Sequence, residues 1–435
     1  HPSAAHPSAA HPSAAHPPDN VRMSSTTSLD RAKIKVLLLE SVHESAIRTF
    51  AAEGYTSVTA RPGSLAPAEL ARAVADAHIL GIRSRTKIPA EVIAAAPKLI
   101  AIGCFSIGTN QVDLDAAQAA GIPVFNAPFS NTRSVAELVI GEIVMLCRGI
   151  PERSAAAHRG EWVKTVGGAT EVRGKTLGIV GYGHIGTQVG LLAEALGMRV
   201  VFHDVETKLA LGNAAAVDRL SALLERSDVV TLHVPETRQT RGMIGARELA
   251  QMRPGAHLIN ASRGTVVDID ALAQALEARH LAGAAIDVFP SEPSASGEEF
   301  RSPLRRFDNV ILTPHIGGNT VEAQEGIGSE VAAKLIRYSD NGSTLTAVNF
   351  PEVALPEHPG KHRLLHIHRN EPGVLAQVNG VLSRSGINIA SQYLETAGKV
   401  GYAVIDVDGI DRPLSLALKK ELDAIAATIR TRVLY

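Results

Sequence analysis

The chain of 435 residues has few cysteines, few aromatic residues and almost no net charge. Its two cysteines, Cys104 and Cys147, lie in apolar runs with no second Cys or His at metal-ligand spacing. This excludes a disulfide scaffold and predicts buried thiols in a reducing compartment. Aromatic residues make up only 4%, which argues against an aromatic-rich β-sandwich. Lys and Arg (43) balance Asp and Glu (44), so bulk charge favours neither nucleic acid nor an anionic membrane as a partner.

Long apolar runs are also missing, since Gly, Pro or a charge interrupts each one before it reaches membrane-spanning length. Residues 1–18 repeat His-Pro-Ser-Ala-Ala three times and lack the features of a signal or transit peptide. Such Pro-rich low complexity cannot bury a core, so we expect a disordered tail over 1–30 rather than a metal-binding segment. Met23 is the candidate native start. We expect a soluble cytoplasmic protein without a metal ion.

Short apolar runs alternate with amphipathic stretches from Lys33 onward, which predicts parallel sheets covered by helices on both faces. A first block has expected strands at 34–39, 77–83, 99–104 and 123–126. A second block has six, at 177–180, 200–203, 229–233, 257–260, 284–288 and 310–313, the number expected of a dinucleotide-binding sheet. Between the blocks we expect a long helix that begins near Asn131 and carries a capping box at 134–137.

The last 75 residues form a separate pattern after a segment, 349–360, that contains three prolines and is interpreted as a linker. Strands at 364–368, 388–394, 401–407 and 428–434 and two helices, opening at 371–373 and near Pro413, predict the order βαββαβ. That order is a ferredoxin-like fold. The expected fold class is therefore α/β, with two Rossmann-like doubly wound parallel-sheet domains and a C-terminal ferredoxin-like domain.

A glycine-rich loop follows the first strand of the second block and opens a helix. Gly181 can make the turn, Gly183 can admit a pyrophosphate, and Gly186 allows the helix to pack on the sheet. Asp204 ends the next strand, where an acid accepts hydrogen bonds from ribose hydroxyls and repels a 2′-phosphate. The pattern predicts NAD rather than NADP. A structural turn without a ligand is the alternative interpretation.

Three polar residues follow later strand ends of the same block. Arg263 can grip a carboxylate and polarise the neighbouring carbonyl. His315 can exchange a proton with a hydroxyl or carbonyl oxygen, and Glu292 is suited to fix its tautomer and raise its pKa. These groups favour hydride transfer between a 2-hydroxy acid and a dinucleotide. Asp287 either meets the nicotinamide carboxamide or is a buried structural acid.

A basic cluster lies elsewhere: Arg83, Ser84 and Arg85 follow the second strand of the first block, Asn131 opens the long helix, and Lys164 lies between the blocks. Two arginines that flank a serine can hold a dianion such as a phosphate monoester. A solvated basic loop is the alternative.

These motifs closely resemble the D-isomer-specific 2-hydroxyacid dehydrogenase family, in its bacterial phosphoglycerate dehydrogenase type with one C-terminal ACT domain. The resemblance runs from about Lys33 to Tyr435. The stretches that carry it are 103–105, 108–113, 125–139, 181–187, 260–268, 284–289 and 312–318 in the two blocks, and 366–370, 372–375 and 386–389 in the C-terminal unit.

The resemblance implies roles position by position. The implied catalytic residues are Arg263, Glu292 and His315. The implied NAD contacts are Gly181, Gly183, His184, Ile185, Gly186, Asp204, Ala261, Ser262, Arg263, Asp287, His315, Gly317 and Gly318. The implied substrate contacts are Arg83, Ser84, Arg85, Asn131 and Lys164, and the implied contacts for serine as an effector are His368, Asn370 and Asn388. Arg369 and Glu371 flank Asn370 with charges in the opposite order to the family pattern, which puts the sensitivity to serine in question.

The resemblance also implies a discontinuous substrate-binding domain, 31–130 and 318–348, around an NAD-binding domain at 131–317, with a linker at 349–360 and an ACT domain at 361–435. It implies oxidation of D-3-phosphoglycerate to 3-phosphohydroxypyruvate, the entry to serine synthesis, inhibition by L-serine, reduction of 2-oxoglutarate by some relatives, and a homotetramer.

Three other functions stay open at this point. One is a 2-hydroxyacid dehydrogenase for an unphosphorylated substrate, which would leave Arg83 and Arg85 unpaired. A formate dehydrogenase of the same fold would be expected to carry Gln in place of Glu292. A non-enzymatic NAD-sensing protein is the third, and for the C-terminal unit a plain dimerisation module is the alternative.

Overall fold

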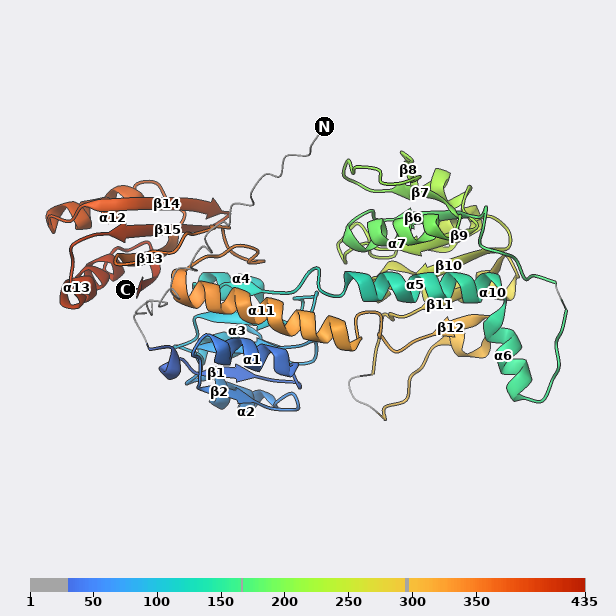
Figure 1. Cartoon of the computed structure of the whole chain (residues 1–435), viewed down its shortest axis with the longest axis horizontal. Helices are drawn as coiled ribbons and strands as arrows, with labels where there is room; N and C mark the ends of the chain where they lie inside the picture. Colours follow the sequence, from blue (N-terminus) through green and yellow to red (C-terminus); the bar gives the residue numbers. More distant parts are fainter. Residues whose placement is uncertain (1–29, 166, 294–296, 435) are drawn as a thin grey trace, which may run out of the picture.

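The computed structural model describes residues 30–165, 167–293 and 297–434. The expected disordered tail, apart from its last residue, and the candidate start Met23 lie outside the described residues. The described chain forms two parallel sheets and one antiparallel sheet, so the expected α/β fold class is confirmed (Figure 1). Among the described residues, no helix combines the length and the apolar character needed to cross a bilayer.

The first sheet has five parallel strands in the order β2-β1-β3-β4-β5. Its strands are β1 (Val36–Leu38), β2 (Val58–Ala60), β3 (Ile79–Ile82), β4 (Ala101–Cys104) and β5 (Val124–Phe125), and its helical segments are η1 (Arg31–Lys33), α1 (Glu44–Ala52), α2 (Pro67–Val74), α3 (Ala90–Ala94) and α4 (Leu114–Ala119). The expectation of four strands is wrong by one. The extra strand, β2, lies at the edge of the sheet and is partly exposed, so it lacks the continuous apolar run of its neighbours.

The second sheet has seven parallel strands in the order β12-β11-β10-β9-β6-β7-β8. Its strands are β6 (Thr176–Val180), β7 (Arg199–His203), β8 (Ala215–Ala216), β9 (Val229–Leu232), β10 (Ala256–Asn260), β11 (Leu281–Ile286) and β12 (Val310–Leu312), and its helical segments are α6 (Ile150–His158), α7 (His184–Ala195), α8 (Leu220–Leu224), α9 (Ala246–Gln251), η2 (Gly264–Val266), α10 (Ile269–Glu277) and η3 (Pro303–Arg306). The six expected strands are confirmed. The seventh, β8, consists of two exposed alanines at the sheet edge and has no apolar signal.

Helix α5 (Thr132–Cys147) follows the crossing from the first sheet to the second and packs against α7, β10 and β11 (Figure 1). Its start near Asn131 is confirmed, because Asn131 is the residue that precedes the first helical turn. The expected capping box at 134–137 is wrong, since Ser134 already lies inside the helix. Its hydroxyl lies instead 2.7 Å from that of Thr320, next to the start of a later helix.

That later helix, α11 (Val321–Asn341), returns to the first sheet, where it packs on α1 and β4 (Figure 1). Gly328 permits the close approach to α1, because a Cβ at this position would lie 2.2 Å from the hydroxyl oxygen of Ser45. Val331 and Leu335 are fully buried in one core with Phe50. The chain therefore crosses twice between the two sheets, once before α5 and once before α11.

The C-terminal unit has the expected order βαββαβ, which confirms its ferredoxin-like fold. Its elements are β13 (His362–Arg369), α12 (Val374–Arg384), β14 (Ile389–Ala397), β15 (Val400–Val407), α13 (Arg412–Asp423) and β16 (Thr428–Leu434), and its antiparallel strands run in the order β14-β15-β13-β16. Both helices share a core with Leu364, Ile405 and Val433 on one face of the sheet.

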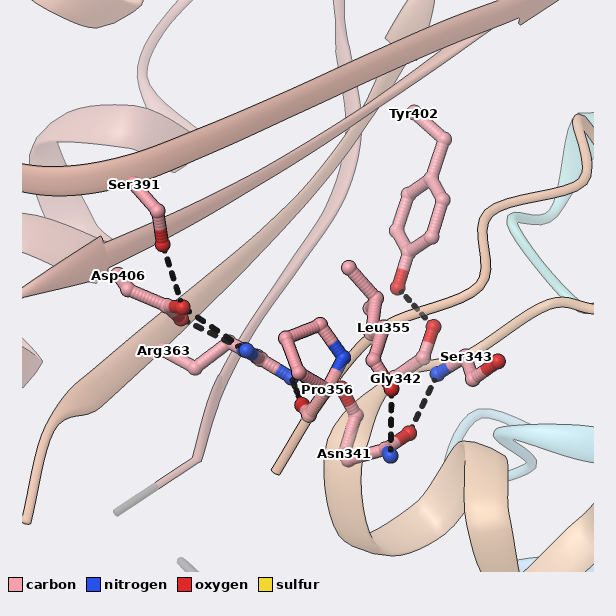
Figure 2. Close-up of polar contacts among 9 residues, drawn as sticks. All are labelled: Asn341, Gly342, Ser343, Leu355, Pro356, Arg363, Ser391, Tyr402 and Asp406. Carbon is pink, nitrogen blue, oxygen red and sulfur yellow. Dashed lines mark hydrogen bonds and ion pairs between the residues drawn. The ribbon is translucent and has the colours of Figure 1, made fainter. Parts of the chain in front are cut away.

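The other face of this antiparallel sheet packs against the first block. Ile367 and Tyr402 belong to the same core as Tyr338 of α11 and Phe350. The hydroxyl of Tyr402 donates to the carbonyl of Gly342, the residue that ends α11, at 2.7 Å (Figure 2). The segment 349–360, interpreted as a linker, has no helix or strand, yet Phe350 is buried in this joint.

A buried arginine crosses the same joint (Figure 2). Arg363 of β13 is 0% exposed and forms a bidentate ion pair with Asp406 of β15, at 2.6 and 2.8 Å. Its remaining nitrogen donates to the carbonyls of Asn341, at 3.0 Å, and Pro356, at 2.9 Å. Ser391 of β14 donates to the same aspartate at 2.7 Å. One guanidinium thus links the C-terminal sheet to the end of α11.

Candidate active site

The glycine-rich loop between β6 and α7 has the geometry of a phosphate cradle. Gly181 has a φ of 90°, and a Cβ there would lie 2.4 Å from the carbonyl oxygen of His233. A Cβ at Gly186 would lie 2.2 Å from the carbonyl of Gly181, whereas one at Gly183 would meet nothing within 4 Å. Helix α7 therefore begins beside open space, with no side chain capping its free N–H groups, as an anion requires.

Two neighbours complete this end of the site. Asp204 lies just after β7 and accepts hydrogen bonds from the backbone N–H groups of Tyr182, at 2.7 Å, and Glu206, at 3.0 Å. The carboxylate is thereby held beside the glycine-rich loop, where a ribose would lie. The exposed ring of His184 contacts that of Phe129 in a tilted arrangement, with ring centroids 4.2 Å apart. Ile185 follows on the same first turn of α7.

His315 lies after β12 in a left-handed conformation, with a φ of 55°. Its Nδ1 donates to Glu292, whose two oxygens lie at 2.9 and 3.1 Å. This hydrogen bond raises the pKa of His315 above its ordinary value, although burial opposes the rise. Burial would raise the pKa of Glu292, but the hydrogen bond and charge of His315, the N–H of Phe289 and the charge of Arg263 together lower it. The pair presents the other ring nitrogen, Nε2, for proton exchange.

Asp287 holds the His315 loop in shape. It is 2% exposed, and its carboxylate accepts from the Thr313 hydroxyl at 2.7 Å and from the N–H groups of Ile316, at 2.8 Å, and Gly317, at 2.9 Å. These three bonds fit the structural alternative for Asp287. Gly318 follows directly, and a Cβ there would lie 2.3 Å from the side-chain nitrogen of Asn131.

Arg263 lies in a turn after β10 that Asn260 organises. The side-chain oxygen of Asn260 accepts from both the N–H and the hydroxyl of Ser262, and its amide nitrogen donates to the carbonyl of Arg263. Ala261 lies between Asn260 and Ser262 in the sequence, and the bend is at Ser262. Burial lowers the pKa of Arg263, while Glu236 and Glu292 act in the opposite direction. Arg263 is thus a half-buried cation in the electrostatic field of the His315–Glu292 pair.

A cavity of about 420 Å³ brings the two halves of the chain together. Glu292 and His315 line it from the second block, and Arg85 lines it from the first. Ser84 is exposed in the same loop, and Arg83 is half-buried, with its pKa lowered by burial. Lys164 is not brought to this cavity. It lines a separate hollow of about 480 Å³ together with Arg148 and Arg153.

The expected effector residues lie at opposite ends of the C-terminal sheet. His368 is buried at the end of β13, and Asn370, just beyond it, donates to the carbonyl of Gly398 at 3.2 Å. Asn388 precedes β14. Gly401 pairs with His368, whereas Val407 pairs with Ile389, so six residues of β15 separate the two ends, or about 20 Å. Arg369 and Glu371, the reversed charges, form an ion pair with each other at 2.6 Å.

Four residues that hold the loops of the site were not predicted to have a role, although three of them lie in stretches that carry the family resemblance. Glu40 and Gln111 hold the Arg83–Arg85 loop, Asn260 holds Arg263, and Thr313 fastens the His315 loop. Glu40, Asn260 and Thr313 follow or end apolar runs, whereas Gln111 lies in a polar turn. For the first three the available signal was a polar residue at or just after a strand end, which is shared by many positions without a function.

Two family models match the chain. The one described as D-isomer specific 2-hydroxyacid dehydrogenase, NAD binding domain, matches residues 140–317, and an AHAS small subunit-like ACT domain matches residues 364–430.

Curated relatives match over nearly the whole chain. A D-3-phosphoglycerate dehydrogenase of Escherichia coli (strain K12) is 60% identical over 408 residues, which cover 94% of this chain and 99% of the relative. D-3-phosphoglycerate dehydrogenase 1 of Saccharomyces cerevisiae is 48% identical over 414 residues, which cover 92% and 88%. Among solved structures, D-lactate dehydrogenase of Aquifex aeolicus, complexed with NAD and lactic acid, is 28% identical with a TM-score of 0.64, and the match covers 73% of this chain and 100% of that one.

Proposed function

This chain belongs to the D-3-phosphoglycerate dehydrogenases of the D-isomer-specific 2-hydroxyacid dehydrogenase family, and from that membership we propose that it oxidises D-3-phosphoglycerate to 3-phosphohydroxypyruvate with NAD. The observation that carries this proposal is the shared cavity, where Arg85 of the first block faces the His315–Glu292 pair of the second. A proton-exchanging histidine and a cation for a dianionic tail are thus within one substrate's reach.

Each residue of the proposed site has a role that follows from its charge. Arg263 holds the substrate carboxylate and polarises the adjacent C–O bond. His315 accepts the hydroxyl proton at Nε2 in the oxidative direction and returns it to the carbonyl oxygen in the reverse direction. The ionised carboxylate of Glu292, which accepts the hydrogen bond from Nδ1 of His315, stabilises the imidazolium that forms. NAD, when bound, supplies the acceptor for the hydride that leaves the same carbon.

NAD fits the cradle that the structure provides. The unfilled space beside Gly183 and the uncapped start of α7 suit a diphosphate, and Asp204 suits the adenosine ribose hydroxyls. His184, Ile185, Ala261, Ser262 and the Gly317–Gly318 pair surround the same edge of the sheet. A 2′-phosphate would meet the carboxylate of Asp204, so NAD is favoured over NADP.

Arg83, Ser84 and Arg85 are proposed to hold the phosphate, with Asn131 at the crossing between the blocks. The test is the NADH-linked rate with 3-phosphohydroxypyruvate beside that with hydroxypyruvate. A strong preference for the phosphorylated compound is expected. Equal use of both would reduce the protein to a general 2-hydroxyacid dehydrogenase. 2-Oxoglutarate belongs in the same assay, because its second carboxylate can also pair with Arg85.

Serine is proposed to bind between two copies of the C-terminal unit. Strand β14 forms an exposed edge of the sheet, and antiparallel pairing of two β14 strands about Tyr393 would bring Asn388 of one copy level with Gly398 of the other. Gly398 already accepts the hydrogen bond of Asn370. The three expected effector residues would then meet at the shared edge.

A homotetramer in the cytoplasm completes the proposal. The exposed β14 edge supplies one contact between copies. Lys164, which does not line the cavity that holds Arg85 and His315, lies on the surface of the NAD-binding half. Both cysteines are free and buried, as suits a reducing compartment. Light scattering of the purified protein gives the mass directly.

A further inference from the structure

Glu40 is a buried carboxylate that no step of the proposed mechanism uses. It lies two residues after β1, behind Leu39, is 7% exposed, and has a left-handed φ of 64°. A non-glycine residue rarely adopts this conformation, so the surroundings must offset its strain. No arginine or lysine in the described part of the chain forms an ion pair with it.

The carboxylate of Glu40 is occupied by one short loop of backbone. Its oxygens accept N–H groups from Thr86 at 2.7 Å, Arg85 at 3.0 Å and Arg83 at 3.3 Å. These are the amides of the loop that presents Arg83 and Arg85, 43 to 46 residues away in the sequence. Because the amides point to Glu40, the two guanidinium groups are left as the loop's donors to a substrate.

Gln111, 4% exposed, holds the same loop through a carbonyl rather than an N–H group. Its side-chain nitrogen donates to the carbonyl of Arg83 at 2.7 Å and to that of Gly108 at 3.2 Å. A Cβ on Gly108 would lie 4.0 Å from a guanidinium nitrogen of Arg263. The loop that carries Arg83 and Arg85, called the cation loop below, is therefore bound both by Glu40 and by the segment around Gln111, which borders Arg263.

We propose that Glu40 is a positioning residue that sets the place of Arg85 relative to His315, and thereby the preference of the enzyme for a phosphorylated 2-oxo or 2-hydroxy acid over its unphosphorylated counterpart. This rests on the proposed function. A phosphate at the far end of the substrate reaches Arg85 only if the loop lies at a fixed distance from the reacting carbon. An unphosphorylated acid makes no such demand.

The test compares Glu40→Gln with wild type and with Glu91→Gln, an exposed glutamate of α3 in the same domain. Glutamine keeps the shape, but its NH₂ group faces an amide N–H, so it cannot accept all three bonds. The measurement is kcat/KM for 3-phosphohydroxypyruvate and for hydroxypyruvate, with NADH affinity from fluorescence quenching. We expect the ratio of kcat/KM for 3-phosphohydroxypyruvate to that for hydroxypyruvate to fall about 10- to 100-fold in E40Q. The fall should come mainly from a higher KM for the phosphorylated substrate, because the charge-assisted hydrogen bonds that place the loop are disturbed. Glu91→Gln should leave the ratio unchanged.

The outcomes separate the two proposals. If wild type shows no preference for the phosphorylated substrate, the proposed function fails. If wild type shows the preference and E40Q keeps it, or loses activity equally on both substrates, the positioning role of Glu40 is wrong. Should E40Q not fold, Gln111→Leu releases the loop at the carbonyl of Arg83, and an unchanged ratio there would also overturn the inference.

Discussion

At the scale of single residues, proton exchange in the proposed mechanism depends on the His315–Glu292 pair. Since Glu292 raises the pKa of His315, the imidazole stays protonated to higher pH than a free one. Reduction needs that proton, so its rate falls as pH rises through this raised pKa. Glu292→Gln should move the alkaline fall of kcat/KM for reduction to lower pH by about one unit. A pH–rate profile with an unmoved alkaline limb would contradict the assigned pairing.

Two glycines of the nucleotide loop are predicted to fail in different ways. Gly183→Ala has room for its methyl group in the free protein but fills the space meant for the diphosphate, so NADH should bind at least about tenfold more weakly at unchanged Tm. Gly186→Ala places a Cβ against the carbonyl of Gly181 and should lower Tm, at a cost of about 1–3 kcal/mol. Fluorescence titration and thermal melts separate the two effects, and equal Tm losses would contradict the prediction.

What could be predicted at this scale depended on local motifs. Gly181, Arg263 and His315 lie in short segments whose chemistry can be recognised from the adjacent residues in the sequence. Glu40 and Gln111 act through hydrogen bonds to backbone far away in the sequence, and a backbone amide carries no sequence identity. Nothing in the chain could have connected them to the cation loop before the fold was known.

At the scale of elements, continuous apolar runs predicted every fully buried strand, because a strand covered on both faces has no polar alternation. The edge strands β2 and β8 were missed, since their partly or wholly exposed residues give no such run. The capping box failed for a related reason. Asn131 starts the α5 helix without a side-chain cap, and its surroundings at the crossing between the blocks decide where the helix begins.

The joint between the C-terminal sheet and α11 depends on the bonds of one residue, Arg363. Arg363→Ala would leave Asp406 buried without its cation and the carbonyls of Asn341 and Pro356 without their donor. Breaking a buried pair in this way costs about 3–5 kcal/mol, so thermal melts should show a Tm lower by several degrees. Lys419→Ala, which removes an exposed pair with Asp423 on α13, is the control and should cost at most about 0.5 kcal/mol. Equal melts for the two variants would show that the joint does not depend on Arg363.

At the scale of the whole molecule, the cavity of the proposed active site joins groups from both blocks of one chain, whereas the expected effector residues lie apart. Arg85, Glu292 and His315 meet within one chain because α5 and α11 cross between the two sheets. His368 and Asn388 remain at opposite ends of the antiparallel sheet. Sequence motifs identify the residue types of both sites equally well, but they do not say whether one copy or two completes a site.

Mixed oligomers distinguish these cases. Chains carrying His368→Ala and chains carrying Asn388→Ala should each form enzyme insensitive to serine, because every site lacks one group. The two variants are co-expressed with separate tags and purified as hybrids, and each mixed interface has two serine sites. At one site, His368 and Asn370 of the Asn388→Ala chain meet the intact Asn388 of the other chain, whereas the second site lacks both groups. We therefore expect serine inhibition to return at about half of the sites in mixed interfaces. Alanine at either position lies outside the cavity of the proposed active site, so basal turnover of the hybrids shows whether the chains have folded. Titration with serine then reports on the effector site alone. Hybrids as insensitive as either parent would show that serine does not bridge two copies.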